Sequence, residues 1–226
     1  MIKRLLVIFV LFAAVLSANA STYYDQKNQR EKQNAVNEVG FRILNANKIK
    51  YPMNFCYNNK NTVNAYSAHS NRNITVYNGI INYMDDEDEL AAVISHEISH
   101  SIDSSEGIMR GYFSFVPYIF TPRKFERKAD KRAIDFMVKA GYNPVAMIVM
   151  MNKAFPQYRY EFLSTHPLAS RRMMYVYEYI YLKYPEYLKN NKYYDNIYYQ
   201  NFLLTSQENR RKLQRKIETG KKANYD

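Results

Sequence analysis

The sequence predicts an α+β fold that is mainly α, with a small β-sheet and a helical C-terminal extension. Apolar residues recur at helical spacing in several long segments, whereas only two short runs are rich in β-prone residues. The chain has 226 residues, 47% of them hydrophobic, which suffices for one domain with a sizeable core plus appendages. We expect an export signal at 1–20, a domain at 21–184 and a Tyr-rich, basic extension at 185–226.

The first twenty residues are typical of a secretory signal peptide. Lys3 and Arg4 precede an apolar run over 5–16, which is too short to span a bilayer comfortably. Small residues then lead to a predicted cleavage site after Ala20. We therefore expect an exported protein, periplasmic or associated with the cell envelope; an uncleaved N-terminal anchor is the alternative.

The first structured elements are predicted to be one helix and two strands. Residues 26–47 show apolar residues at helical spacing among polar ones. Phe55–Tyr57 and Ile74–Tyr77 are short β-prone runs bounded by Asn and Gly. The single cysteine, Cys56, excludes an internal disulfide framework and is interpreted as a small buried thiol.

A second helix is predicted over 86–100. An acidic cluster at 85–88 precedes an apolar stretch, and acidic residues favour the first turn of a helix because they complement its dipole. Residues 101–111 contain Ser and two Gly and are predicted to be a loop. The aromatic segment 112–120 is too short to span a membrane, so it either lines a cleft, touches a lipid surface or is a buried connector.

The second half of the chain is predicted to be helical. One helix covers about 124–140 and is closed by Gly141, and further helices begin near Pro144 and Pro167. Alternating tyrosines over 175–181 would also suit a strand. Methionines 150 and 151 belong to no metal-binding pattern and are interpreted as packing residues.

Two histidines flank a short segment that carries the strongest chemical signal. His96 and His100 are four residues apart on a predicted helix, so both rings lie on one face and can reach one ion. Glu97 stands where this pattern places the general base of a zinc peptidase. The chain has only four histidines, and two of them fill the pattern. We therefore predict a catalytic zinc site with three protein ligands and one open position.

The third ligand is predicted on the next helix. A metzincin would have Gly at 103 and His at 106, but this chain has Asp103 and Glu106, which excludes that class. Glu126 and Asp130 are four residues apart and share a helix face. We expect Glu126 to bind the metal and Asp130 to accept a hydrogen bond from a ligand imidazole. A solvated helix charge is the alternative for Glu126 taken alone.

Four motifs in order between about residues 40 and 177 resemble the HtpX/BepA-like family of zinc metalloendopeptidases. This is metallopeptidase family forty-eight, related to the CAAX prenyl endopeptidase. Along the chain, the motifs are Asn64-Ala65-Tyr66 ahead of Gly79, the helix segment 88–100, Glu126 with Ala129 and Asp130, and Ser164-Thr165-His166-Pro167 with Arg172. The resemblance implies a zincin-like metallopeptidase domain of the gluzincin type, with a small β-sheet and an active-site helix.

The resemblance also implies the cofactor and the chemistry. One Zn²⁺ per chain would be bound by His96, His100 and Glu126, and Glu97 would act as general base in the hydrolysis of peptide bonds. His166 is implied as a catalytic residue that stabilises the oxyanion. Gating of the open zinc position, or helix capping, are alternative roles for His166.

Substrate contacts are implied on the edge strand. Asn64 and Ala65 would bind the substrate backbone. Arg172 is expected to brace the site through an ion pair, because arginine forms bidentate pairs with carboxylates.

The expected partner is a protein or peptide substrate. The resemblance suggests a role in envelope protein quality control. The alternative is a zinc-bearing chaperone or assembly factor with gated proteolysis. A third hypothesis is a basic surface-binding module with a vestigial site. The formal net charge is +11, and either the basic tail or the 112–120 segment could contact a membrane. Export argues against nucleic acid, so no nucleic-acid partner is expected.

Overall fold

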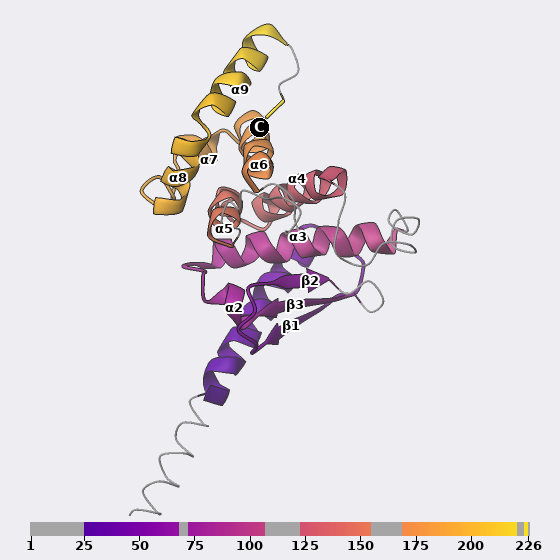
Figure 1. Ribbon diagram of the computed structural model, residues 1–226. Helices are drawn as coiled ribbons and strands as arrows, with labels where there is room; N and C mark the ends of the chain where they lie inside the picture. Colours follow the sequence, from indigo (N-terminus) through magenta and orange to yellow (C-terminus); the bar gives the residue numbers. More distant parts are fainter. Residues whose placement is uncertain (1–24, 68–71, 107–122, 155–168, 221–223, 226) are drawn as a thin grey trace, which may run out of the picture.

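The computed structural model describes residues 25–67, 72–106, 123–154, 169–220 and 224–225. The expected signal peptide, the aromatic segment 112–120 and His166 lie outside these residues. Figure 1 shows a small sheet with an N-terminal helix beside it and a long helix, α3, across it. The helices that follow α3 in the chain are stacked on its other side and end in the C-terminal extension. The fold is α+β and mainly α, as the sequence predicts.

The sheet has three strands in the order β1-β3-β2. β1 (Asn54–Asn58) pairs in parallel with β3 (Asn73–Tyr77), and β2 (Ala65–Ser67) pairs antiparallel to β3. The two predicted strands are thus confirmed, each slightly longer than expected. β2 is an edge strand, and it packs against α3.

The N-terminal helix covers residues 25–46 and closes the other edge of the sheet. The Gln33 side chain donates to the Phe55 carbonyl at 2.9 Å and accepts from the Tyr57 N–H at 2.8 Å, so it satisfies backbone groups on the outer side of β1. Gly40 permits close packing, because a Cβ there would lie 2.6 Å from the Phe55 ring. The N-terminal helix therefore satisfies backbone groups on the β1 edge of the sheet, and it does not do so on the β2 edge.

After the short helix α2 (Asn78–Ile81), the helix α3 spans Glu87–Ser105. Asp86 is its N-cap and accepts a hydrogen bond from the Glu89 N–H at 3.0 Å. The predicted start is confirmed, but the predicted loop over 101–105 is wrong. The helix continues because Asp103, fully buried, forms ion pairs at 2.8 Å with Lys128 and Arg132 of the next helix.

Two helices pack on α3: α4 (Arg123–Lys139) and α5 (Ala146–Ala154). The next helix, α6 (Ala169–Lys183), packs on both of them. Gly141 follows α4 with φ +79°, a left-handed conformation that suits glycine after a helix, as predicted. The alternating tyrosines lie on a helix and not on a strand. α6 buries Met173, Val176 and Ile180 at helical spacing, which decides the alternative.

The C-terminal extension is helical: α7 (Glu186–Lys189), α8 (Ile197–Thr205) and α9 (Gln207–Thr219). α8 packs on α5, and α9 packs on α6, where Lys216 forms an ion pair with Glu178. Cys56 is half-buried, so its interpretation as a buried thiol is wrong; it lies on the edge strand β1.

In the described part of the chain, no helix has the length and apolar character needed to cross a membrane.

Candidate metal centre

Three side chains from two packed helices converge in the interior. His96 and His100 project from α3 one turn apart, and their Nε2 atoms are 3.0 Å apart. Glu126 enters from the first turn of α4, with carboxylate oxygens 3.5 Å from His96 Nε2 and 3.3 Å from His100 Nε2. Glu126 is 0% exposed, which excludes the alternative of a solvated helix charge.

The spacing of these donor atoms suits a tetrahedral ion. Ligand atoms bound to zinc at about 2.0–2.1 Å lie roughly 3.3 Å from one another in a tetrahedron. The observed separations of 3.0–3.5 Å are close to that value. Within the described ranges, these three residues are the one group of His, Cys, Asp and Glu side chains spaced to hold a metal ion. The group could therefore bind a metal with little rearrangement.

Asp130 orients the first histidine. Its Oδ1 lies 3.0 Å from His96 Nδ1, so a proton on Nδ1 leaves the Nε2 lone pair directed at the metal group. Burial lowers the pKa of His96, but hydrogen bonds and charges from Asp130 and Glu126 outweigh it and raise the pKa to about 10. The two carboxylates thus favour positive charge at this point, which a bound cation would supply.

Arg172 of α6 joins the two carboxylates. Its Nε and one terminal nitrogen donate to the two oxygens of Asp130 at 2.9 and 2.7 Å, and the other terminal nitrogen lies 2.8 Å from Glu126 Oε2. Burial raises the pKa of Asp130, but the charge of Arg172 and the contact with His96 hold it below its ordinary value. Arg172 therefore favours the ionised form of Asp130 and also pairs with Glu126.

Glu97 lies beside the metal group and lines a cavity of about 60 Å³. Asn64 and Ala65, from the edge strand side, line the same cavity as His96 and Glu97. The structure thus brings together eight of the nine predicted site residues, and Arg172 forms the ion pair that was expected of it. His166, the remaining one, falls outside the described residues.

The apolar wall of this cavity was not foreseen as part of the site. It consists of α3 and α5 side chains and neighbours: Val93, Ala92, Ile80, Met147, Met150 and Met151. Methionines 150 and 151 are buried, as their interpretation as packing residues requires, and they also face the cavity. Helical spacing on α5 indicates a buried face, but it does not reveal which part of α3 that face covers.

Comparison with known proteins gives matches to metallopeptidases. The family model described as "Peptidase family M48" matches residues 26–116 and 112–180. The Beta-barrel assembly-enhancing protease of Escherichia coli (strain K12) is 25% identical over 185 residues, which cover 61% of this chain and 37% of that protein. The protein of the same name from Yersinia pestis is 26% identical with the same coverage. The chain thus matches little more than a third of the length of these relatives.

Proposed function

The chain belongs to peptidase family M48, and from this premise we propose that it is an exported, zinc-dependent endopeptidase. The observation that carries the proposal is the convergence of His96, His100 and Glu126 next to Glu97. Two imidazoles and one carboxylate are a ligand set of catalytic zinc sites, which keep a further position open.

Zinc at this site would polarise the scissile carbonyl and lower the pKa of a water molecule at the open position. Glu97 accepts a proton from the attacking water and delivers it to the leaving amine. Asp130 and Arg172 act through the ligands: Asp130 holds the His96 ring, and Arg172 holds Asp130 and Glu126. We also retain His166 as a donor to the developing oxyanion.

Substrate backbone is proposed to bind along β2. An edge strand offers unpaired N–H and C=O groups to an extended peptide. Asn64 and Ala65 bring this edge to the cavity that contains His96 and Glu97. The opposite edge of the sheet is occupied by Gln33, so β2 is the edge available for this role.

We propose that the methionine-lined cavity receives an apolar substrate side chain. Met147, Met150 and Met151 form a flexible wall that adapts to different apolar shapes. Burial of one Leu or Phe side chain there would contribute roughly 1.5–3 kcal/mol. The enzyme would then prefer substrates with an apolar side chain at this position, and it would not require one particular sequence.

The cellular role is proposed to be envelope protein quality control in the periplasm. It is supported by the signal-like first twenty residues and by relatives whose name refers to β-barrel assembly. That name also favours a second candidate, a zinc-bearing assembly factor with gated proteolysis. We retain the division into 1–20, 21–184 and 185–226 as part of this proposal.

The test of the zinc endopeptidase is metal dependence on an unfolded protein. We expect the purified full chain to cleave unfolded casein, to lose that activity with a chelator and to regain it with one equivalent of Zn²⁺. Cleavage that persists after complete metal removal would overturn the proposal. An assembly factor would instead promote β-barrel insertion equally well when Glu97 is replaced by Gln.

A further inference from the structure

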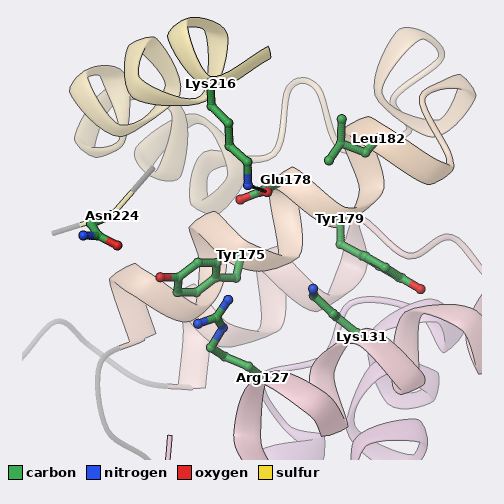
Figure 2. Close-up of a pocket in the computed structure, with 8 residues that line it drawn as sticks. All are labelled: Arg127, Lys131, Tyr175, Glu178, Tyr179, Leu182, Lys216 and Asn224. Atoms are coloured by element: carbon green, nitrogen blue, oxygen red, sulfur yellow. Dashed lines mark hydrogen bonds and ion pairs between the residues drawn. The ribbon is translucent and has the colours of Figure 1, made fainter. Parts of the chain in front are cut away.

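A second cavity lies away from the metal group, between α4, α6 and the C-terminal residues (Figure 2). Its volume is about 390 Å³, within the range of small-ligand pockets. It is lined by Arg127, Lys131, Tyr175, Glu178, Tyr179, Leu182, Lys216 and Asn224. None of these residues takes part in the proposed peptidase chemistry.

Two cations in this cavity have no carboxylate partner in the described part of the chain. Arg127 and Lys131 are exposed and one turn apart on α4, and Figure 2 shows both extending toward α6. Neither forms an ion pair with a described residue. Asp135, one turn beyond Lys131, accepts instead from Tyr179, Tyr184 and Lys183 at 2.8–3.0 Å.

The one acidic side chain in the described lining is already neutralised. Glu178 forms an ion pair with Lys216 through one oxygen and accepts from the Tyr225 hydroxyl at 2.6 Å through the other. Tyr225 is buried, so the C-terminal end of the chain holds Glu178 in this arrangement. Among the described residues that line the cavity, the positive charges of Arg127 and Lys131 are thus left without a carboxylate partner.

Aromatic rings fix the orientation of the arginine. The Arg127 guanidinium carbon lies 3.5 Å from the Tyr175 ring centroid, and Tyr175 is itself packed edge-on against Tyr225 at 5.0 Å between centroids. The Lys131 ammonium lies 5.3 Å from the Tyr179 ring centroid. A stacked guanidinium is planar and pre-oriented, and its N–H edges remain able to bind two oxygens of one oxyanion.

We propose that this cavity binds a phosphate monoester. A fork of N–H donors and a neighbouring ammonium match a group with three oxygens and a charge close to −2. The positive charges of Arg127 and Lys131 balance the charge of a phosphate monoester, whereas a ligand carboxylate, with one negative charge, would balance only one of the two. The group could belong to a soluble phosphorylated compound or to a lipid headgroup, and the chemistry of recognition is the same. The site is independent of the proposed peptidase function.

The test uses the purified full chain at constant ionic strength. Calorimetry with glycerol 3-phosphate measures the soluble arm. Flotation with phosphatidylcholine vesicles containing phosphatidic acid, a monoester, or phosphatidylglycerol, a diester, measures the lipid arm. The test variant is R127Q/K131Q, and the matched control is R30Q/K189Q, which removes the same charge from exposed positions elsewhere. R127K keeps the charge but removes the fork, and melting temperatures confirm that each variant folds.

We expect R127Q/K131Q to lose roughly tenfold or more in affinity, because both positive charges that bind the phosphate oxygens are removed. R127K should lose part of the affinity, and the control R30Q/K189Q should keep the wild-type affinity. Binding to glycerol 3-phosphate indicates a soluble ligand, and binding to phosphatidic acid vesicles alone indicates a lipid. The proposal is overturned if neither probe binds, if both double variants weaken binding equally, or if the diester lipid binds as well as the monoester.

Discussion

Arg172 on α6 forms a two-hydrogen-bond pair with Asp130 on α4, at 2.9 and 2.7 Å, in the buried interior. Its third nitrogen reaches Glu126 at 2.8 Å. One cation therefore serves two carboxylates that both contact His96. This network joins α3, α4 and α6 around the proposed metal position, so the stability of the helix stack and the geometry of the site depend on the same side chain.

Arg172→Met should destabilise the protein strongly. The substitution removes the guanidinium that pairs with the buried carboxylates of Asp130 and Glu126, and breaking such a pair costs about 3–5 kcal/mol. Urea unfolding of the metal-free protein measures the effect. Arg211→Met is the control, because Arg211 pairs with Glu208 on the surface and should change stability by less than about 1 kcal/mol. Equal losses in the two variants would contradict the account.

Asp130→Asn should weaken metal binding while the fold persists. Asparagine keeps the size of Asp130 but removes the charge that orients His96 through Nδ1. Loss of such a partner typically lowers metal affinity by about 10–100-fold. Competition with a chelator of known affinity measures the change. Asp135→Asn, on the same helix but bound to Tyr179, should leave the affinity unchanged; a similar loss there would refute the assigned role.

The N-cap of α3 should make stability depend on pH. Burial raises the pKa of Asp86, but Lys192, Tyr193 and the Glu89 N–H together hold it below its ordinary value. A carboxylate whose pKa is lower in the folded protein than in the unfolded chain, where it is about 3.9, stabilises the fold at pH values above the unfolded pKa. This stabilisation is lost as the pH falls through the pKa of the folded state. Asp86→Asn should therefore be less stable than wild type near pH 7, and the difference should shrink below about pH 4.

Urea unfolding at a series of pH values measures this difference. Glu38→Gln, which changes an exposed carboxylate in the middle of the N-terminal helix, serves as the control and should show little difference at any pH. A gap between wild type and Asp86→Asn that stays constant down to pH 3 would show that the charge of Asp86 is not what stabilises the α3 N-terminus.

Val93→Phe should change substrate preference more than stability. Val93 is partly exposed to the cavity beside Glu97, and a larger side chain there occupies the space proposed for an apolar substrate group. The ratio of kcat/KM for matched peptides with Leu or Ala at the varied position should fall by roughly tenfold, since one buried Leu contributes about 1.5–3 kcal/mol. An unchanged ratio would place the specificity pocket elsewhere.

Local spacing was sufficient to predict the centre of the site. His96 and His100 meet because helix geometry brings residues four apart onto one face, and the same rule links Glu126 to Asp130. The acidic cluster ahead of the apolar stretch correctly placed the start of α3 near Asp86. These features depend on few residues and on rules that hold within a single helix.

Features that depend on tertiary contacts were not predicted. Ser101–Ser105 were assigned to a loop from composition, but the buried ion pairs of Asp103 with α4 hold them in the helix. The role of Met147 in the cavity wall depends on how α5 packs on α3. The cavity at Arg127 is closed in part by Asn224 and Lys216, which lie far along the chain from α4 and α6. None of these contacts has a signature within a short sequence window.

The central claim is that Glu97 performs the chemistry at a metal held by other residues. Glu97→Gln keeps the shape of the side chain but cannot accept the proton, whereas Glu126→Gln weakens a proposed ligand. Zinc content and casein cleavage of both variants are the decisive measurement. We expect Glu97→Gln to bind one zinc per chain and to lose proteolysis by roughly 100-fold or more. Cleavage at the wild-type rate by Glu97→Gln, or loss of its zinc, would contradict the account.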